Sequence, residues 1–513
     1  DPLSARAGQS IDFMVSAEGA REVKAEIVRL VHGDFNPAGP GFIEESVATD
    51  IPATLPVKRQ YTQNGAFARV SDPDALLAPK GAFTVYAFIW PSLPVGERQA
   101  VLGRWSVSGS KGYGLGINPE GKLEFWVGDG ETVDQVTADA PLVPKVWVLA
   151  AASFDPATGQ ARLRQIDVQN SWNSHIGPVT PYDHNSHTVE KLRCAPAVAD
   201  APFLIAGAHE ENPERGRFVS MLFNGKIDRS GIVARALSAD EMGAIAKGET
   251  PDDPIAYWDT TAGFSDRGIG TMIQDTGPNG LHAEGVNRPV RAMTGWNWRG
   301  RDDSFRLNPS QYGGVAYHDD ALTDCGWTPT VTWTPPEDFR SGVYALKVTA
   351  GDAIDRVPVI VRPATPRAKI AVQMSTFTYL AYANEHLSFD AQIAQAIVAH
   401  TPVISGEDIE YNKLQEFGLS TYDHHADGAG VCYSSWKRPI INIRPGYRMA
   451  GMNFPWALPA DLSLLWWLEH AGYDYDLITD HDLDREGLDA LTPYKTVINV
   501  THPEYYSEGM LDA

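Results

Sequence analysis

The pattern of apolar residues changes at residues 362–369, and this change limits the folds that the chain can adopt. Before it, apolar or alternating runs of five to eight residues are bounded by Gly, Pro and Asp, which is typical of short β-strands. After it, strand-like runs alternate with helix-like stretches. The segment itself, RPATPRAK, has no apolar periodicity and is expected to be a linker. We therefore predict an all-β part up to about residue 365 and an α/β part beyond it.

Within the all-β part, residues 66–248 contain regularly spaced strands that suggest a β-sandwich. A last strand is expected at 223–232, followed by a short helix with a capping box of Ser238 and Glu241. These features resemble the laminin-G or concanavalin-like jelly roll. The other strands are expected at 83–90, 99–105, 112–117, 122–127 and 146–155.

Strand-like runs also flank this region on both sides. They lie at 10–15 and 24–33 before it, and at 341–350 and 355–363 after it. We therefore expect residues 1–65 and 249–365 to form one discontinuous β domain into which the jelly roll is inserted.

Residues 367–513 are predicted to form a mostly parallel sheet covered by helices. A further helix is expected after Ser507, and we expect the domain to be incomplete at its C-terminal end. In such sheets the chemistry gathers beyond the carboxyl ends of the strands. The expected strands are 369–374, 439–443, 475–479 and 494–500, and the expected helices are 388–400, 461–472 and 484–491.

The charge balance argues against some classes of partner. The chain has 42 Lys and Arg residues against 65 Asp and Glu residues, a net charge of −23, which repels nucleic acids and anionic membranes. No apolar run approaches the roughly 18 residues of a membrane span. The three cysteines, Cys194, Cys325 and Cys432, form no CxxC pattern, so we expect neither a disulfide framework nor a thiolate zinc site. A cytoplasmic location fits this composition best.

Three stretches of the α/β part combine tyrosines with other polar residues next to predicted strand ends. They are STFTYLAYAN at 375–384, STYDHHADGAGVCY at 420–433 and THPEYY at 501–506. Phenolate and carboxylate are hard anionic donors, which suit Fe³⁺ better than zinc or copper. The unperturbed pKa of tyrosine is about 10, so a trivalent cation is needed to ionise it at neutral pH.

Several motifs resemble the large (beta) subunit family of N,N-dimethylformamidase. They are TYLAYAN, YDLITDHDLD and VTHPEYYS in the α/β part, and AEIVRLVHGDFNPAGPGFIEE near the beginning of the chain. The resemblance implies an α/β domain similar to class I glutamine amidotransferases and a mononuclear Fe³⁺. It also implies a small second subunit, in an α2β2 or larger assembly.

The same resemblance implies an amidase that hydrolyses N,N-dimethylformamide to dimethylamine and formate. Fe³⁺ would act as a Lewis acid and would activate water. Matched motif to motif, its ligands are Tyr382, Tyr422 and Glu504. His502 would handle the proton for the departing amine, with Glu504 beside it, and Phe377 is a candidate wall of the substrate pocket.

Neighbouring residues remain alternatives for each ligand. Tyr379 could replace Tyr382, Tyr433 could replace Tyr422, and Tyr505 or Tyr506 could also turn inward. Glu504 has one competing acid, Glu508, which falls in the following helix.

Two other groups of residues suggest different chemistry. His424, His425 and Asp427 tempt a zinc interpretation, but adjacent strand residues point to opposite faces and no HExxH motif accompanies them. Cys432 is a candidate nucleophile, yet it lacks the strand-to-helix elbow, so we expect a buried apolar role. The alternative function is a carbohydrate-binding protein with an inactive amidotransferase-like domain.

Overall fold

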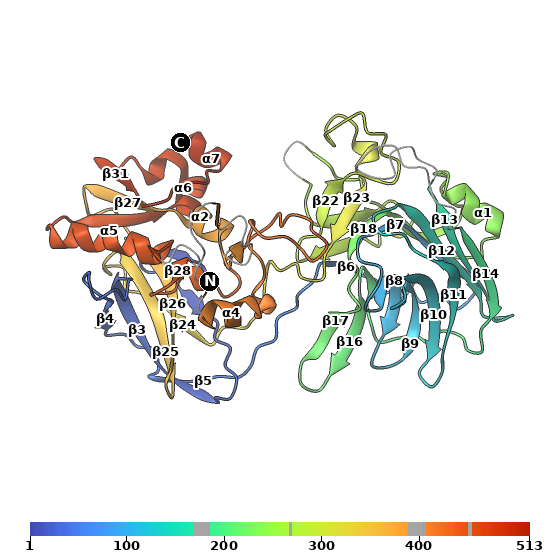
Figure 1. Ribbon diagram of the computed structural model, residues 1–513, viewed down its shortest axis with the longest axis horizontal. Helices are drawn as coiled ribbons and strands as arrows, with labels where there is room; N and C mark the ends of the chain where they lie inside the picture. The colour runs from blue at the N-terminus through green and yellow to red at the C-terminus, as the bar shows by residue number, and fades with distance from the viewer. Residues whose placement is uncertain (169–184, 266–268, 388–394, 397–403, 405, 450–453) are drawn as a thin grey trace. The chain divides into compact units, whose positions relative to one another are not determined.

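The computed structural model describes residues 1–168, 185–265, 269–387, 395–396, 404, 406–449 and 454–513. Two compact units account for the chain (Figure 1). Unit 1 consists of residues 1–62, 323–424 and 429–513, and unit 2 of residues 63–322 and 425–428. In the described residues no helix is long and apolar enough to cross a membrane.

Unit 2 is an all-β domain whose strands form one hydrogen-bonded network that closes on itself. Strand β7 (Phe83–Pro91) lies at its centre and pairs with both β12 (Val148–Asp155) and β18 (Gly225–Val233). Its core is one cluster of buried side chains, mainly Phe, Val, Leu, Ile and Ala. The other strands are β6 (Phe67–Val70), β8 (Gln99–Ser106), β9 (Lys111–Ile117), β10 (Lys122–Asp129), β11 (Val133–Pro141), β13 (Gln160–Asp167), β14 (Ser186–Lys191), β15 (Phe203–Ile205), β16 (Ala208–Asn212) and β17 (Gly216–Ser220).

Helix α1 (Ala239–Ile245) follows β18 and begins with the predicted capping box. The amide of Glu241 donates to the Ser238 hydroxyl at 3.3 Å, and the amide of Ser238 donates to the Glu241 carboxylate at 2.8 Å. These two bonds satisfy backbone donors that the first helical turn leaves open. This local prediction is confirmed.

The end of unit 2 differs from the expected domain boundary at residue 248. Strands β19 (Pro254–Asp259), β20 (Met272–Asp275), β21 (Ala283–Val286), β22 (Val290–Met293) and β23 (Gly314–Tyr317) belong to the same network. β21 pairs with β6, and β23 pairs with β18. Residues 254–317 therefore complete the β domain of unit 2 and do not join residues 1–65. These partners of β21 and β23 lie far away in the sequence, so local strand signals did not reveal these two pairings.

Unit 1 contains a mixed, mainly antiparallel sheet that joins the start of the chain to residues beyond 341. Its order is β1-β26-β25-β3-β4, where β3 is Glu22–His32, β25 is Gly342–Ala350 and β26 is Ala353–Arg362. β3 pairs with β25 from Lys24 to Arg29. The remaining strands of this region are β1 (Ser4–Arg6), β4 (Ile43–Val47), β5 (Thr54–Pro56) and the separate pair of β2 (Ile11–Phe13) with β24 (Val331–Trp333).

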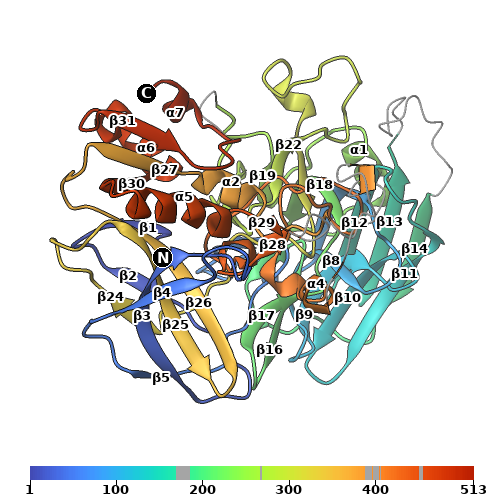
Figure 2. The same ribbon diagram turned by 60° about the vertical axis from the view of Figure 1, so that its left-hand side comes forward.

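A three-stranded parallel sheet forms the rest of the core of unit 1 (Figure 2). Its order is β30 (Tyr475–Thr479), β27 (Ile370–Met374), β31 (Thr496–Asn499). Helix α5 (Leu458–His470) buries Leu458, Leu462, Leu465 and Leu468 in a core shared with both sheets. The parallel pairing agrees with the strand-and-helix pattern beyond residue 369, whereas the amidotransferase likeness stays a prediction.

Shorter elements complete unit 1. They are α2 (Thr376–Ala381), α4 (Gly406–Asn412), α6 (Asp480–Glu486), α7 (Glu508–Leu511), the 3-10 turns η3 (Gln415–Phe417), η4 (Ile441–Ile443) and η5 (Gly487–Ala490), and the pair β28 (Arg448–Met449) with β29 (Phe454–Pro455). In unit 2, residues Pro309–Gln311 form the 3-10 turn η1.

Two predictions in the α/β part need comment. The strand expected at 439–443 is wrong, because η4 occupies Ile441–Ile443. The amide of Ile441 donates to the Asn384 side chain at 2.9 Å, and Ile440 and Ile443 are buried in the core, so tertiary contacts override the strand propensity of an isoleucine-rich run. The helix expected at 388–400 lies almost entirely outside the described residues.

Candidate functional site

The short helix α2 carries the first predicted ligand. It begins directly after β27, with Ser375 at its N-cap, and ends with Tyr382 as the C-cap residue. The Tyr382 amide donates to the Thr378 carbonyl at 3.1 Å, and the Asn442 side chain donates to the Tyr382 carbonyl at 3.0 Å. Tyr382 is 9% exposed, so its backbone and ring are both held in place.

The two other predicted ligands reach α2 from different loops. The amide and the hydroxyl of Thr421 each lie 3.0 Å from the Ala381 carbonyl and donate to it, which fixes the turn that carries Tyr422. The amide of Glu504, in the loop after β31, donates to the Thr378 hydroxyl at 3.1 Å. Backbone groups next to both ligands are therefore tied to the same helix.

This arrangement brings Tyr382, Tyr422 and Glu504 together, as the motif match predicts. The Tyr382 hydroxyl donates to Glu504 Oε2 at 2.9 Å, and the Tyr422 hydroxyl donates to Glu504 Oε1 at 3.2 Å. The two phenol rings stack with centroids 4.2 Å apart. His502 joins the cluster, with its Nε2 atom 2.9 Å from Glu504 Oε2. We call these four residues the tyrosine–glutamate cluster.

The protonation states of the cluster follow from its surroundings. Burial raises the pKa of Tyr382 to about 12, and the hydrogen bond to Glu504 acts in the same direction. Burial also raises the pKa of Tyr422 well above its usual value. For Glu504, burial raises the pKa, but hydrogen bonds from Tyr382, His502 and Tyr422 outweigh it and leave the pKa below its usual value. The phenols are thus neutral donors at pH 7, and the carboxylate is charged.

The donor set fits a hard, highly charged cation. Two phenol oxygens, from residues far from Glu504 in the sequence, each lie within hydrogen-bond distance of its carboxylate. Phenols with raised pKa values give up their protons only to a strong positive charge, which an ion such as Fe³⁺ provides. Among the described residues, no group of three His, Cys, Asp or Glu side chains offers a separate site for a metal ion. The tyrosine–glutamate cluster differs from such groups because two of its oxygen donors are phenols.

The structure places the alternative tyrosines differently. Tyr379 is buried and donates to Asp461. Tyr433 is 39% exposed, and Tyr506 is 46% exposed with its hydroxyl directed to the Pro503 carbonyl. Tyr505 does reach the cluster, where its hydroxyl forms a short hydrogen bond with that of Tyr422.

The histidines of the 420–433 stretch make other contacts. His425 Nδ1 lies 2.5 Å from Asp320 Oδ1, and Asp427 Oδ2 lies 3.4 Å from His318 Nε2. The His318 and His425 rings stack with centroids 3.8 Å apart. All four of these residues belong to unit 2. His425 and Asp427 thus face separate partners. Among the described residues, they do not combine with His424 into a three-ligand zinc site.

Two single-residue expectations need correction. Cys432 is exposed, not buried as we predicted, because its stretch runs along the surface between Gly430 and Tyr433. Phe377, the expected pocket wall, packs with Leu483 and Met510 and so belongs to a different apolar cluster from Tyr382.

Sequence reasoning missed several residues around the cluster. The Trp456 ring lies 4.7 Å from the His502 ring and 5.5 Å from the Tyr382 ring, measured between centroids. Glu385 is buried and accepts hydrogen bonds from the Tyr447 hydroxyl at 2.8 Å and the Leu387 amide at 2.9 Å. Burial raises the pKa of Glu385 to about 7. Glu385 lies three residues after Tyr382 in TYLAYANEH, and this closeness to a predicted ligand could have marked it as a candidate site residue.

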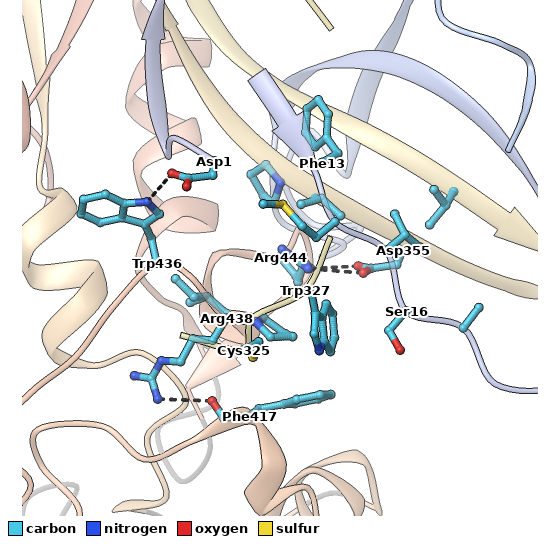
Figure 3. A pocket seen from close by; sticks show the side chains of 18 of the residues that line it. Asp1, Phe13, Ser16, Cys325, Trp327, Asp355, Phe417, Trp436, Arg438 and Arg444 are labelled. Atoms are coloured by element: carbon cyan, nitrogen blue, oxygen red, sulfur yellow. Dashed lines mark hydrogen bonds and ion pairs between the residues drawn. The ribbon is translucent and has the colours of Figure 1, made fainter. Parts of the chain in front are cut away.

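Unit 1 also contains a cavity of about 650 Å³ that is separate from the cluster (Figure 3). Its walls are mainly apolar and aromatic, including Phe13, Trp327 and Phe417. Its two arginines already have partners: Arg444 pairs with Asp355 at 2.9 Å, and Arg438 donates to the Phe417 carbonyl at 3.2 Å. None of the four residues of the tyrosine–glutamate cluster lines this cavity.

Family models match two parts of the chain. Residues 290–513 match "N,N-dimethylformamidase beta subunit-like, C-terminal", and residues 63–164 match "Concanavalin A-like lectin/glucanases superfamily". The second match confirms the concanavalin-like prediction for unit 2. A solved structure with a similar region is the sialidase carbohydrate-binding module of Ruminococcus gnavus bound to α2,3-sialyllactose. It is 15% identical, covers 37% of this chain and 96% of its own, and its TM-score of 0.26 is too low to support any conclusion.

Curated relatives match the entire chain. The N,N-dimethylformamidase beta subunit of Paracoccus aminophilus is 42% identical over 522 aligned positions, which cover 100% of this chain and 68% of the relative. The protein of the same name from an Alcaligenes species is 41% identical with the same coverage.

These matches define the class as hydrolases that act on amide C–N bonds, which confirms the predicted enzyme class. The chain belongs to the N,N-dimethylformamidase beta subunit family, as the motifs predicted.

Proposed function

We propose that this chain is a subunit of an iron-dependent amidase that hydrolyses N,N-dimethylformamide to dimethylamine and formate. The observation that carries the proposal is the convergence of Tyr382 at the end of helix α2 with Tyr422 and Glu504 from two loops, in a chain 42% identical to a subunit of that name. These three side chains would hold one Fe³⁺ ion. When bound, the ion supplies Lewis-acid polarisation of the amide carbonyl and lowers the pKa of water.

The protein's own groups supply the proton transfers. His502 Nε2 lies 2.9 Å from Glu504 Oε2, so the imidazole can hold a proton beside the carboxylate. The His502 side chain is 42% exposed and can exchange that proton with solvent. A dialkylamine is a poor leaving group until it is protonated, and His502 is the group in the cluster suited to that task.

Aromatic rings around the cluster suit a small substrate with methyl groups. The rings of Tyr382, Trp456 and His502 lie within 6.1 Å of one another, measured between centroids. These rings offer apolar contacts for two methyl groups, while the polar oxygens of the cluster suit the carbonyl. Selection among small amides would depend on this apolar fit.

The assembly is part of the same proposal. The relatives are named beta subunits, which supports a hetero-oligomer. We propose, from the family resemblance of the motifs, that the second subunit is small and that the assembly is α2β2 or larger. The parallel order β30-β27-β31 is compatible with an amidotransferase-like domain, and its carboxyl ends carry α2 and the Glu504 loop. The cytoplasmic location remains a prediction from composition.

One experiment tests the proposed function. We expect the purified protein to contain ferric iron with a visible phenolate charge-transfer band and to release dimethylamine from N,N-dimethylformamide. Tyr382→Phe and Tyr422→Phe should each lose the band and the iron, whereas Tyr433→Phe, a change at an exposed tyrosine from the same stretch as Tyr422, should retain both. Iron-free protein with full activity would refute the proposal, as would full iron in both ligand variants.

A further inference from the structure

Asp461 is a buried carboxylate to which the sequence analysis gave no role. It lies in the first turn of α5 and is 1% exposed. Its Oδ1 atom accepts two hydrogen bonds from Thr501, from the amide at 3.0 Å and from the hydroxyl at 2.5 Å. Its Oδ2 atom accepts a short hydrogen bond from the Tyr379 hydroxyl.

Each of these donors lies three residues before a predicted iron ligand. Tyr379 precedes Tyr382 by almost one turn of α2, and Thr501 precedes Glu504 in the loop after β31. Asp461 therefore connects the two segments that carry the ligands without being part of the tyrosine–glutamate cluster. A second link, from the Glu504 amide to the Thr378 hydroxyl at 3.1 Å, joins the same two segments directly.

The support behind Asp461 is rigid. Helix α5 has 13 residues and is packed into the core by four buried leucines. Asp461 is held on this support and accepts its three hydrogen bonds from Tyr379 and Thr501, so it restricts both partner segments. Residues that orient metal ligands commonly change metal affinity by a factor of about 10 to 100.

We infer that Asp461 is a positioning residue that sets the separation between the Tyr382 phenol and the Glu504 carboxylate. This inference rests on the proposed function, because it assigns the separation to the binding of one Fe³⁺ ion. It also gives a role to Tyr379, three residues before Tyr382, because the Tyr379 hydroxyl anchors helix α2 to Asp461.

A purely structural role for Asp461 can be separated from this one by comparison with Asp480. Asp480 is 2% exposed and accepts hydrogen bonds from the Gln373 side chain at 2.8 Å and from the Phe377 amide at 3.0 Å. It anchors the beginning of α2 but has no hydrogen bond to the loop of Thr501 and Glu504. Asp480→Asn is thus a matched control for Asp461→Asn.

The first measurement compares ferric iron in the purified holoprotein. In Asp461→Asn the new amide group cannot accept from one of its two partners, so we expect iron affinity to fall by about 10-fold to 100-fold and the charge-transfer band to shift. Asp480→Asn should lose thermal stability while its affinity stays within about twofold of the original protein and its band is unchanged. Unchanged affinity and band in Asp461→Asn would overturn the inference. An equal loss of iron affinity in Asp461→Asn and Asp480→Asn would also overturn it.

The second measurement does not depend on iron. Amide hydrogen exchange at Thr501 and Glu504 should become at least about tenfold faster in Asp461→Asn and should stay unchanged in Asp480→Asn. If Asp461→Asn does not fold, Tyr379→Phe removes only the donor at Oδ2 and should show smaller changes in the same direction. A wild-type protein that binds no ferric iron refutes the proposed function, and the exchange rates still decide whether Asp461 holds the loop. Unchanged exchange in both variants refutes the positioning role alone.

Discussion

Asp275 in unit 2 and Asp461 in unit 1 are both buried carboxylates that accept three hydrogen bonds, but they hold different kinds of structure. Asp275 accepts from the amides of Tyr257 and Gly277, each at 2.8 Å, and from that of Leu281 at 2.7 Å. All three donors lie in neighbouring strands of one β domain or in the turn between them. Asp461 accepts from Tyr379 and Thr501, which are brought together from 82 residues before it and 40 residues after it.

The comparison teaches that burial of a carboxylate is not by itself a sign of function. A buried acid whose donors are backbone amides of its own turn and of a neighbouring strand stabilises that local structure. A buried acid whose donors belong to two ligand-bearing segments controls the distance between them. Variants in the two units should therefore affect different measurable quantities.

The largest effect is expected for Glu504→Gln in unit 1. It removes the negative charge that accepts from Tyr382, Tyr422 and His502, so activity should fall by at least about 100-fold. The Glu504 side chain is 37% exposed, so with iron removed from both proteins the free energy of unfolding should differ by less than about 1 kcal/mol. Dimethylamine release and urea denaturation check the two parts. If Glu504→Gln kept more than half of the original activity, Glu504 would not be part of the active site.

The next effect should appear in stability only. Asp275→Ala leaves three backbone amides in unit 2 without their acceptor, which should lower the free energy of unfolding by about 3 kcal/mol. Activity per folded molecule should stay within twofold, because unit 2 contains none of the predicted ligands. Denaturation monitored together with activity tests this. A loss of activity in fully folded protein would break the distinction between the two units.

The smallest effect should depend on pH. Hydrogen bonds from Arg362, and to a smaller extent Arg485, lower the pKa of Glu486 to about 2 against the opposing effect of burial. A lowered folded-state pKa gives stability that is present above the unfolded value of about 4.5 and is lost as the pH falls toward 2. Glu486→Gln should therefore cost about 2 kcal/mol at pH 7 and almost nothing near pH 2.

Denaturation of both proteins across this pH range measures the difference. A penalty that is the same at pH 7 and pH 2 would mean that the Glu486 charge contributes nothing. Asp275→Ala provides the contrast, since its partners are uncharged backbone amides rather than guanidinium groups.

The parts of the fold that could be predicted are those with strong local signals. The apolar run before Thr376 gave β27, the run before Asp480 gave β30, and Ser238 with Glu241 gave the start of α1. Strands β19 to β23 were assigned to the wrong domain because the pairs that tie them to unit 2, β21 with β6 and β23 with β18, join residues distant in the sequence. The run at 439–443 failed because contacts with Asn384 and the core decided its conformation.

In the candidate site, too, some residues could be predicted from local motifs and others only from the fold. The motifs pointed to Tyr382, Tyr422 and Glu504, and the structure brings these residues together. Asp461 could not be found in this way, because an acid in the first turn of a helix is ordinary in sequence and favourable near the positive end of the helix. Only the fold shows that its oxygens reach Tyr379 and Thr501.

The wide spacing of the cluster along the chain has a thermodynamic consequence. Tyr382 and Glu504 are separated by 122 residues, so a denatured chain has no preassembled set of these oxygens. A cation bound there must bind the folded form alone, and by mass action each tenfold excess of free ion over its dissociation constant adds about 1.4 kcal/mol in favour of that form. Occupancy and melting temperature are therefore coupled, and a chelator would act as a denaturant of this unit.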